Sequence, residues 1–575
     1  MSAMIDEYLS AWDELTAPGA QFAMKEISVR DVPIRVFESA LPSMRSVWEL
    51  ARGYGDRDYV VYEDERYTYS EADAIIRSLA SRLRNDYGVE PGDRVAIAMR
   101  NYPEWVFGYW AIVSIGAACV GMNAWWTTGE MEFGLADSRP KVLIADGERV
   151  ERVLGVLDGL RAESPLHLMT VRYDGALPAD ADRWEDIIDP AAAPAELPEV
   201  DIDPDDDACI FYTSGTTASP KGAQLTHRGS VHNLMHVAFM ASVGGLAAAR
   251  AAEPTTSADD DGQPKQAVLM ASTPLFHVTA NNCVLHPATV SGARIVLTYK
   301  WNPERALELI EREGVTSFSG VPTMSRELLM HPDWGRRDTS TLLGMGGGGA
   351  PLQPDLVDKI DKSLSGGAPR TGYGLTETHG IVTSNSGSLY LAKPASCGRI
   401  VPTLDVRLVD EGGAEVTSGE AGELCVRGSV VIKGYLNREE STADGIRDGW
   451  FRTGDVATID EDGFVFIVDR IKDVVLRGGE NVYCSEVEAA IYENGAVAEV
   501  AVFGVPDDRL GEIVGAAIVL APGKTLTEEQ LRTELAEHMT KFKIPERIWF
   551  LSEALPRNAN GKFVKRELKE SLLTY

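Results

Sequence analysis

The sequence predicts an α/β protein with a large N-terminal domain and a small α+β domain at the end of the chain. Its 575 residues exceed what one hydrophobic core usually organises, so at least two domains are expected. Short apolar runs alternate with helical patterns through the first part of the chain, which is typical of a largely parallel sheet. The residues after Lys472 form a separate pattern of strands and helices.

The first clear element is a helix that follows an irregular cap. Residues 1–50 show little regular pattern. Thr68 and Glu71 then form a capping box, and apolar residues repeat on one helical face until Gly88. Further elements are predicted as a strand over 95–99, a buried helix over 103–115, and strands over 117–122 and 142–145.

An uncharged segment from Trp105 to Trp126 exceeds the length of about 18 residues at which a membrane helix is considered. Gly108, Gly116 and Gly121 interrupt it, and no positively charged flank follows. We therefore interpret it as a buried helix followed by a buried strand. No integral membrane span is expected.

Two segments resemble exposed connections. Residues 244–266 contain runs of Gly, Ala, Pro, Thr and Asp, which predict an exposed insertion. The acidic run over 201–207 could hold a metal ion, but such a run more often forms a solvated linker.

The C-terminal unit has its own strand and helix signals. Helices are predicted over 485–493 and from a Thr527 cap to His538, with strands over 497–503, 512–520 and 547–551. Residues 541–575 hold more basic than acidic side chains, in a chain whose net charge is −32.

The overall charge and the cysteines exclude several protein classes. There are 55 Lys+Arg and 87 Asp+Glu, which argues against broad binding of nucleic acid or anionic membranes. The six cysteines are scattered without a CxxC pair, as expected for reduced thiols in a cytoplasmic protein. The acidic N-terminus does not resemble a secretory signal.

The most informative pattern is a hydroxyl-rich loop after an apolar strand end at 209–212. Small residues allow backbone N–H groups to turn toward an anion, and hydroxyls and a lysine add donors and charge. A simple hairpin turn has a similar composition. Pro220 and Gly222 flank the lysine, so this is no Walker A loop. The candidate phosphate ligands are Thr213, Ser214, Gly215, Thr216, Thr217 and Lys221.

Together with this loop, five further motifs in the same order resemble the adenylate-forming superfamily, which includes acyl-CoA synthetases, peptide-synthetase adenylation domains and beetle luciferases. The motifs are GGGGAPL at 346–352, YGLTE at 373–377, GWFRTGD at 449–455, DRIKD at 469–473 with GGENV at 478–482, and PRNANGK at 556–562. The resemblance covers roughly residues 50–570. It implies stacked α/β sheets and a small β-barrel-like subdomain within residues 1–471, followed by a mobile α+β domain at 472–575.

The resemblance also implies the reaction. A carboxylate attacks the α-phosphate of ATP to give an acyl-adenylate and pyrophosphate, and the thiol of coenzyme A then displaces AMP. Both steps place extra negative charge on oxygen, which fixed donors and cations stabilise. ATP, Mg²⁺ and coenzyme A are therefore the expected ligands.

Several motif residues acquire catalytic roles from the resemblance. Lys221 and the hydroxyl loop are expected to hold the β- and γ-phosphates, and Thr376 the α-phosphate. Glu377 is expected to bind Mg²⁺, although a surface acid is the alternative. Lys562 is expected to bridge the α-phosphate and the attacking carboxylate. Charge alone would place Lys562 in a solvated basic tail.

The nucleoside is assigned in the same way. Tyr373 is expected to stack on adenine, with a core tyrosine as the alternative. Asp455 is expected to accept from the ribose hydroxyls, supported by Arg470, which could instead form a hinge salt bridge. Lys472 marks the expected hinge. Close backbone approach to adenine is assigned to Gly348, Gly349, Ala350 and Gly374.

The acid and the acceptor are assigned by position in the family. His277 is expected at the mouth of the acyl pocket, although it could be a buried core histidine. The other expected pocket residues are Phe318, Gly346, Gly347 and His379. Gly478, Gly479 and Glu480 resemble the loop beside the coenzyme A tunnel.

Glycines at the pocket wall favour a medium- or long-chain fatty acid, with an aryl, arylpropenoic or steroid side-chain acid as the main alternative. The aspartate of amino-acid-activating relatives is missing near His277. An enzyme that loads a separate carrier protein, a luciferase-like oxygenase and a non-catalytic scaffold are the other classes considered. Family members are often dimers, so a homodimer is compatible with the resemblance.

Overall fold

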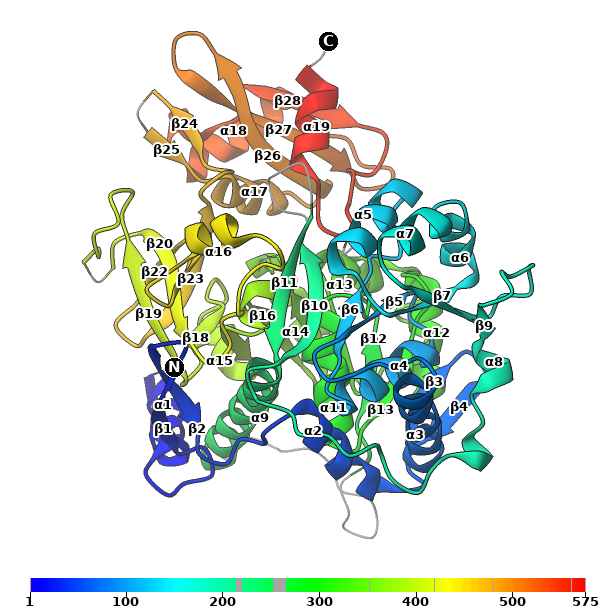
Figure 1. Cartoon of the computed structure of the whole chain (residues 1–575). Coiled ribbons are helices and arrows are strands. Elements are labelled where there is room, and N and C mark those ends of the chain that lie inside the picture. The colour runs from blue at the N-terminus through cyan, green and yellow to red at the C-terminus, as the bar shows by residue number, and fades with distance from the viewer. Residues whose placement is uncertain are drawn as a thin grey trace.

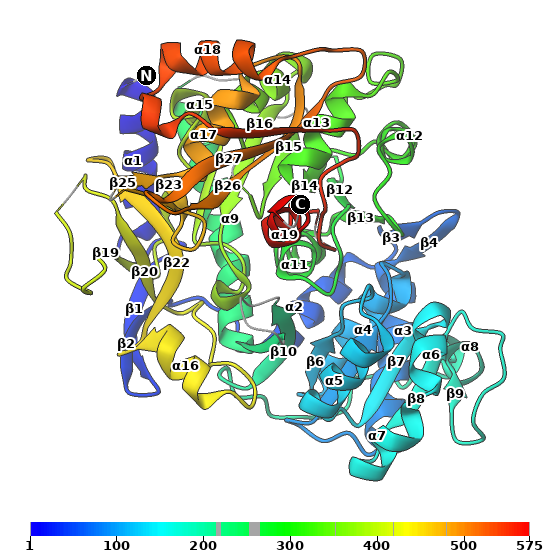
Figure 2. The same cartoon turned by 90° about the horizontal axis from the view of Figure 1, so that it is seen from above.

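Two large sheets and a smaller third one organise the protein, as Figure 1 shows. The computed structural model describes residues 2–213, 220–251, 265–350, 352–417, 419–478, 480–559 and 561–573. The smaller sheet and its helices form the upper part of Figure 1, above the two large sheets. Seen from above in Figure 2, this C-terminal part covers the sheet that carries β14 to β16. The predicted α/β class is confirmed.

A seven-stranded sheet forms one half of the body. Its strands are parallel apart from β11, which pairs antiparallel with β10. In spatial order they are β11 (Lys221–Thr226), β10 (Asp207–Thr213), β6 (Ala118–Gly121), β5 (Arg94–Ala98), β7 (Val142–Asp146), β8 (His167–Val171) and β9 (Asp182–Arg183). Its helices include α3 (Tyr69–Asn85), α4 (Pro103–Ser114), α5 (Thr128–Ser138), α6 (Gly147–Leu154) and α7 (Leu157–Glu163).

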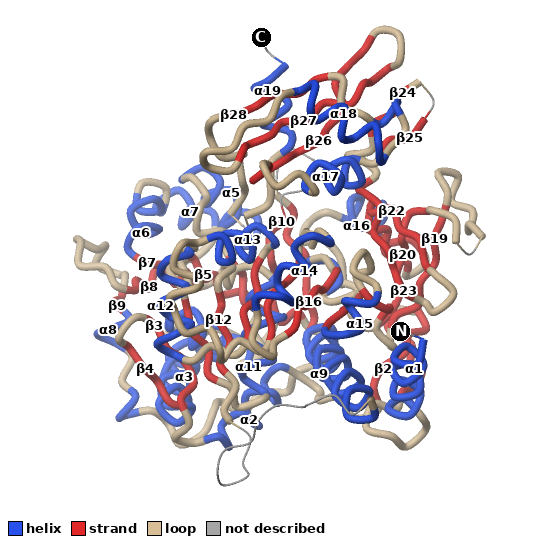
Figure 3. Tube along the Cα trace, turned by 180° about the vertical axis from the view of Figure 1, so that it is seen from behind, coloured by secondary structure: helices blue, strands red, loops and turns tan. Residues whose placement is uncertain are grey.

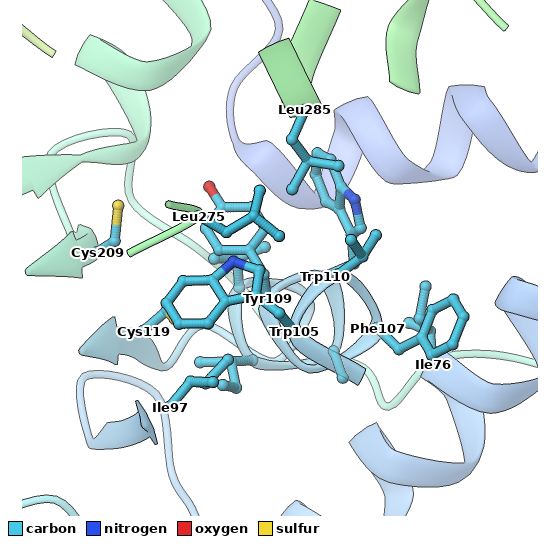
Figure 4. Packing of buried hydrophobic residues seen from close by; sticks show 14 of the residues in the cluster. Ile76, Ile97, Trp105, Phe107, Tyr109, Trp110, Cys119, Cys209, Leu275 and Leu285 are labelled. Carbon is cyan, nitrogen blue, oxygen red and sulfur yellow. The ribbon is translucent and has the colours of Figure 1, made fainter. Parts of the chain in front are cut away.

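Helix α4 lies inside the core. Every one of its residues is buried, and Figure 4 shows Trp105, Tyr109 and Trp110 packed among side chains from β5, β6 and β10. Such a helix is apolar on all sides because protein surrounds it. The interpretation of the uncharged segment as a buried helix and strand is confirmed, and so is the capping box of Thr68 and Glu71 on α3.

A fourteen-stranded sheet forms the other half. It is parallel from β3 to β16 and antiparallel from β16 to β19. The parallel part and its edge are β4 (Glu65–Thr68), β3 (Asp58–Tyr62), β13 (Arg294–Leu297), β12 (Val268–Ala271), β14 (Ser317–Gly320), β15 (Gly344–Gly348) and β16 (Ala368–Tyr373). Helices α12 (Pro303–Glu313), α13 (Pro322–Met330) and α14 (Pro354–Ser363) pack into one core with this sheet.

The expected β-barrel-like region continues the same sheet. Its strands run on from β16 as β17 (Thr383–Ser386), β18 (Gly398–Ile400), β23 (Phe464–Arg470), β22 (Trp450–Ile459), β20 (Gly422–Gly428) and β19 (Leu404–Val409), with β21 (Ile446–Arg447) beside β22. These strands surround a separate apolar cluster that includes Leu424, Val426 and Phe451.

The expectation of an irregular cap at residues 1–50 is wrong. This region contains α1 (Ser2–Thr16), a hairpin of β1 (Met24–Val29) and β2 (Val32–Phe37), and α2 (Met44–Ala51). Ile5, Tyr8 and Trp12 of α1 are buried at helical spacing against α9 (His227–Arg250). Figure 3 shows α1 beside α9. A short amphipathic helix that packs on a distant segment gives little local signal.

The prediction of an exposed insertion over 244–266 is wrong for its first residues. Residues 244–250 continue α9, because the alanine-rich run there favours helix; residues 252–264 lie outside the described part of the chain. Among the described helices, α9 is the one long and apolar enough to cross a membrane by length and composition, and 44% of its most apolar window is buried inside the protein. Its packing against α1 is that of a core helix.

The residues after Lys472 build their own sheet, as predicted. Its strands are β25 (Glu480–Val482), β24 (Val475–Arg477), β27 (Gly511–Leu520), β26 (Val497–Asp507) and β28 (Arg547–Leu551). The helices α17 (Cys484–Tyr492), α18 (Glu528–His538) and α19 (Lys565–Leu573) belong to the same unit, and two apolar clusters form its core.

Candidate active site

A cavity of about 1490 Å³ lies where the two large sheets meet the C-terminal unit. It is larger than the roughly 300–1,000 Å³ of an ordinary small-molecule pocket, so it has room for more than one ligand. Most of the predicted site residues line it: Thr213, Lys221, His277, Gly346, Gly347, Gly348, Gly349, Tyr373, Gly374, Thr376, Glu377, Arg470, Lys472 and Lys562. Residues that lie far apart in the sequence therefore share one space.

Lys562 reaches into this cavity from the C-terminal unit. A Cβ atom on Gly349 would lie 3.0 Å from its Cε and 3.6 Å from its Nζ. Burial and the neighbouring Arg470 lower the pKa of Lys562 to about 8, against the attraction of Asp455 and Glu377. The ammonium group is thus a buried cation beside the end of β15, suited to an anionic reactant.

Glu377 faces the same space, and its Oε1 accepts a 2.9 Å hydrogen bond from the Tyr435 hydroxyl. Lys221 Nζ lies 5.4 Å from the centre of the Tyr435 ring. Burial raises the pKa of Glu377, while Tyr435, Arg470 and Lys562 act in the opposite direction. Tyr435 was not predicted from the sequence, because it lies outside the motifs and reaches the site only through tertiary folding.

The Mg²⁺ expected for this chemistry fits Glu377. In the described part of the chain no three His, Cys, Asp or Glu side chains gather in a metal-binding cluster. A single buried carboxylate suits Mg²⁺, which usually keeps water and phosphate oxygens as its other ligands.

Tyr373, Asp455 and Arg470 form a connected group. The Tyr373 hydroxyl donates a 2.7 Å hydrogen bond to Asp455 Oδ2, and Arg470 Nε lies 3.1 Å from Asp455 Oδ1. Asp455 and Arg470 are register partners on β22 and β23. Asp455 is buried, which raises its pKa, and Arg470 opposes that shift. The pairing of Arg470 with Asp455 brings the two predicted ribose-binding residues together.

His277 lies in the cavity wall at the start of a short helical turn, where its Nδ1 accepts a 3.4 Å hydrogen bond from the Thr279 backbone N–H. Burial, and after it the charge of Lys562, lowers the pKa of His277 to about 3. The imidazole is therefore neutral at physiological pH. A neutral imidazole is suited to positioning a reactant by hydrogen bonds rather than to acting as a general acid.

Two predicted acyl-pocket residues are placed differently by the structure. His379 is completely buried: its Nε2 accepts from the Thr226 backbone N–H at 2.9 Å, and its Nδ1 lies 2.7 Å from the Val430 carbonyl oxygen. It joins β11 to the segment after β20 and does not line the cavity. The assignment of His379 to the pocket is wrong, because its left-handed backbone turns the side chain away.

Phe318 borders the cavity, but its ring is part of the core on the other face of the sheet, 5.6 Å from the ring of Trp301. Side chains alternate along a strand, so its neighbours Ser317 and Ser319 point to the opposite face, toward the cavity. Phe318 thus borders the cavity, as predicted, while its ring packs mainly in the core.

The remaining predicted residues fall outside the cavity lining or outside the described chain. Ala350 follows β15, and Gly478 and Glu480 belong to the β24–β25 turn; none of the three lines the cavity in this arrangement. Ser214, Gly215, Thr216, Thr217 and Gly479 lie outside the described residues.

The sequence did not reveal one wall of the cavity. Helix α9 contributes Val237, Met240, Ala241, Gly244, Gly245, Ala247 and Ala248, and Ala251 follows directly after it. These positions recur at helical spacing, which was the available signal. The floor carries a further unpredicted residue, Arg370 of β16.

The sheets, the small C-terminal unit and the gathered anion-binding residues define an enzyme that joins a nucleotide to a carboxylate. Residues 47–436 match the family model described as AMP-binding enzyme, and residues 486–562 match the AMP-binding enzyme C-terminal domain. The chain therefore belongs to the AMP-binding enzyme family, within the adenylate-forming superfamily that its motifs indicated.

Individual relatives agree. The chain is 35% identical over 505 residues to a feruloyl-CoA synthase from an Amycolatopsis species, covering 87% of this chain and 93% of that protein. It is 32% identical over 567 residues to a long-chain-fatty-acid–CoA ligase of Yersinia pestis, covering 94% and 96%. Its fold matches the structure of the anthranilate CoA ligase AuaEII in complex with anthranoyl-AMP with a TM-score of 0.79 and 25% identity, covering 92% and 98%. The protein is an AMP-forming acid–CoA ligase that uses ATP and coenzyme A.

Proposed function

We propose that this ligase activates a long carboxylic acid, with a medium- or long-chain fatty acid as the first candidate. The observation that carries the proposal is the course of the cavity along α9. Its wall follows one face of that helix from Val237 to Ala251 and continues to Met4 and Tyr8 of α1. A pocket for a small ring would not need to extend so far.

The adenylation motifs lie at one end of this channel. The backbone N–H of Ile381, just after the YGLTE motif, donates to Asn233 Oδ1 at 2.8 Å, one turn before Val237 on α9. From Val237 the helix advances about 21 Å to Ala251 at 1.5 Å per residue. An extended chain covers this distance with roughly 17 single bonds, since three backbone bonds span at most about 3.6 Å.

Small residues keep the channel open. Ala241, Gly244, Gly245 and Ala248 present little side-chain volume on the cavity side of α9. Glycine and alanine at successive turns leave a continuous groove instead of separate pockets. An aryl acid is the second candidate, because it would fill the part of the same groove that lies next to the adenylation motifs.

The residues of the chain have the following roles in the proposed reaction. A carboxylate oxygen attacks the α-phosphorus of ATP, the bond to the bridging oxygen breaks, and pyrophosphate leaves. Lys562 and Thr376 stabilise the charge on the reacting oxygens, and Lys221 holds the departing phosphates. Glu377 would hold the Mg²⁺, which neutralises phosphate charge when bound.

The nucleoside is held by a second group. Tyr373 provides a face for adenine, and Asp455, oriented by Arg470, accepts from the ribose. His277 positions the acyl carboxylate as a neutral donor or acceptor. Tyr373, Arg470 and His277 line one cavity, and the buried Asp455 is bonded to Tyr373 and Arg470, which is consistent with these roles.

In the second half-reaction, the sulfur of coenzyme A attacks the acyl carbon and AMP leaves with the bonding electrons. We propose that residues 472–575 rotate as a mobile domain about Lys472 between the two steps. Rotation would withdraw Lys562 and bring the β24–β25 turn with Gly478, Gly479 and Glu480 toward the cavity.

The substrate proposal is tested with a panel of straight-chain and aryl acids, measuring AMP and acyl-CoA by mass spectrometry. Ala241→Leu adds side-chain volume inside the channel and narrows it. Activity should therefore fall more than about tenfold for long acids and little for short or aryl acids. Ala249→Leu, on the exposed face of α9, is the matched control. Equal activity of Ala241→Leu with acids of every length would contradict the proposal.

A further inference from the structure

A guanidinium group on the cavity floor, that of Arg370, has no counterion among the residues that the structure describes. Arg370 lies on β16, where its side chain is accessible and lines the cavity. Within the described residues it makes no ion pair or hydrogen bond. The protein around the guanidinium lowers its pKa by removing it partly from water. A guanidinium that faces a cavity and has no protein partner there is available to an anionic ligand.

The backbone of the neighbouring strand leaves room for this group. A Cβ atom on Gly344 of β15 would lie 2.5 Å from both Cζ and Nε of Arg370. No real side chain could occupy that position without displacing the guanidinium. Arg370 therefore lies flat over β15, and its side chain runs back along the strand, away from the YGLTE motif.

Hydroxyl groups surround the guanidinium. Arg370 pairs in register with Gly346 on one side and with Ser386 on the other, and Gly346 pairs with Ser319. Ser317 lies two residues before Ser319 on the same face, and all three serines line the cavity. A guanidinium flanked by hydroxyls is a subsite suited to a carboxylate, which can accept two parallel hydrogen bonds from Arg and further ones from Ser.

The subsite lies at a defined distance from the reaction centre. Arg370 lies over Gly344, and Lys562 lies beside Gly349, five residues further along the same strand direction. At about 3.3 Å per residue the two cations are separated by about 16 Å. An extended chain of roughly 13 single bonds covers that distance.

We propose that Arg370 binds a second carboxylate at the far end of the substrate, so that the preferred acids are α,ω-dicarboxylic acids of about 12 to 14 carbons, the length that spans the two cations. This inference rests on the proposed long-acid function. One carboxylate meets Lys562 and is adenylated, while the other meets Arg370 and the serines. The apolar face of α9 covers the methylene chain between them.

The experiment compares dodecanedioic and tetradecanedioic acids with dodecanoic and tetradecanoic acids, using the complete enzyme with ATP and coenzyme A. The wild-type enzyme should show the higher kcat/KM for the diacids. Arg370→Met keeps the length and removes the charge, and it should lower kcat/KM for diacids roughly 10- to 150-fold, as expected for a hydrogen bond to a charged group. Activity with the monoacids should be unchanged or increased.

Two control variants separate recognition from folding. Arg370→Lys keeps the charge but loses the paired geometry, so it should retain part of the diacid preference. Arg336→Met, at an exposed site on the protein surface, should leave all four activities unchanged. Thermal unfolding midpoints of the variants show whether each remains folded.

The possible outcomes are distinct. Activity with long monoacids but not with diacids overturns the role of Arg370 and leaves the long-acid function intact. Loss of diacid and monoacid activity to the same extent in both Arg370 variants also overturns it. Equal kcat/KM for ω-hydroxy acids and diacids would show that charge is not recognised. Failure to activate any long acid overturns the proposed function itself.

Discussion

Arg557 Nη1 lies 3.0 Å from Glu327 Oε1, and this pair joins the C-terminal unit to helix α13 of the body. Nearby, the guanidinium of Arg326 lies 4.8 Å from the centre of the Tyr492 ring, across the same boundary. These contacts accompany the arrangement that places Lys562 in the cavity. They are therefore expected to favour the adenylation pose over the thiol-transfer pose.

Glu327→Gln should weaken that pose selectively. Both side chains of the pair are partly exposed, so a modest effect is expected, about a 2- to 5-fold lower rate of pyrophosphate release. Thiol transfer from a supplied acyl-adenylate should be unchanged or faster. Asp358→Asn, which removes the same charge from an exposed site on α14, is the control. Parallel loss of both half-reactions in Glu327→Gln would contradict the selective role.

Lys562→Ala should abolish adenylation and leave thiol transfer from preformed acyl-adenylate largely intact. The reason is that the ammonium group lies at the cavity end of β15, where the carboxylate and the α-phosphate are expected to meet. The two half-reactions are followed separately, as pyrophosphate release and as acyl-CoA formation. Equal loss of both half-reactions in Lys562→Ala would contradict the assignment of Lys562 to adenylation.

The pH dependence of adenylation should report the same lysine. Its pKa of about 8 means that the free enzyme loses this positive charge as pH rises through about 8. kcat/KM for adenylation should therefore fall on the alkaline side, and kcat should fall at higher pH because bound phosphates favour the charged form. In Lys562→Arg, whose side chain stays charged, the fall near pH 8 should disappear from whatever activity remains.

Lys472→Pro should block one half-reaction selectively. Lys472 lies between β23 of the large sheet and β24 of the C-terminal sheet, where backbone rotation would turn one unit against the other. Proline fixes φ near −65° and removes this freedom. The measurement is the ratio of the two half-reaction rates, with the unfolding midpoint as a check on folding. Wild-type rates in both half-reactions would refute the hinge.

Acid should destabilise this protein through its buried histidines. Burial lowers the pKa of each of them below its ordinary value, so the unfolded chain binds more protons from about pH 6.5 downward, and the free energy of unfolding falls as pH falls. Each histidine contributes up to about 1.4 kcal/mol per pH unit. The group comprises His227, His232, His236, His277, His286 and His379.

Urea unfolding at pH 7 and pH 5 measures this effect. His379→Gln can retain hydrogen bonds to backbone without titrating, so its stability should depend less steeply on pH than that of the wild type. His538→Gln changes an exposed histidine and should leave the slope as it is. An identical slope in His379→Gln would count against the buried-histidine explanation.

Much of the secondary structure could be predicted because the signals were local. The capping box at Thr68, the buried helix that begins at Pro103 and the helix capped by Thr527 all appear at the expected places. Helix α1 was missed because its apolar face is buried only by packing against α9, a contact that the local sequence does not reveal. Residues 244–250 were misread because alanine and glycine can form either helix or loop until a partner packs against them.

The candidate site shows the same difference between features with a local sequence signal and features that depend on tertiary packing. Motif order identified Lys221, Thr376, Glu377 and Lys562, and the structure places all four around one cavity. His379 was misplaced and the direction of the Phe318 ring was not foreseen, because a family position does not show on which side of a turn or strand a side chain lies. Strand alternation turns Phe318 into the core, and a left-handed turn buries His379.

The sequence by itself determined the class of chemistry, because a few residue types in a fixed order are needed to hold phosphate and activate a carboxylate. Tertiary structure decided the shape of the cavity that we propose to hold the acyl chain. Ser319, Gly346, Arg370 and Ser386 come from four strands and meet only through β-sheet register. The charge at the channel floor is therefore a product of strand pairing and of the glycines that make room for it.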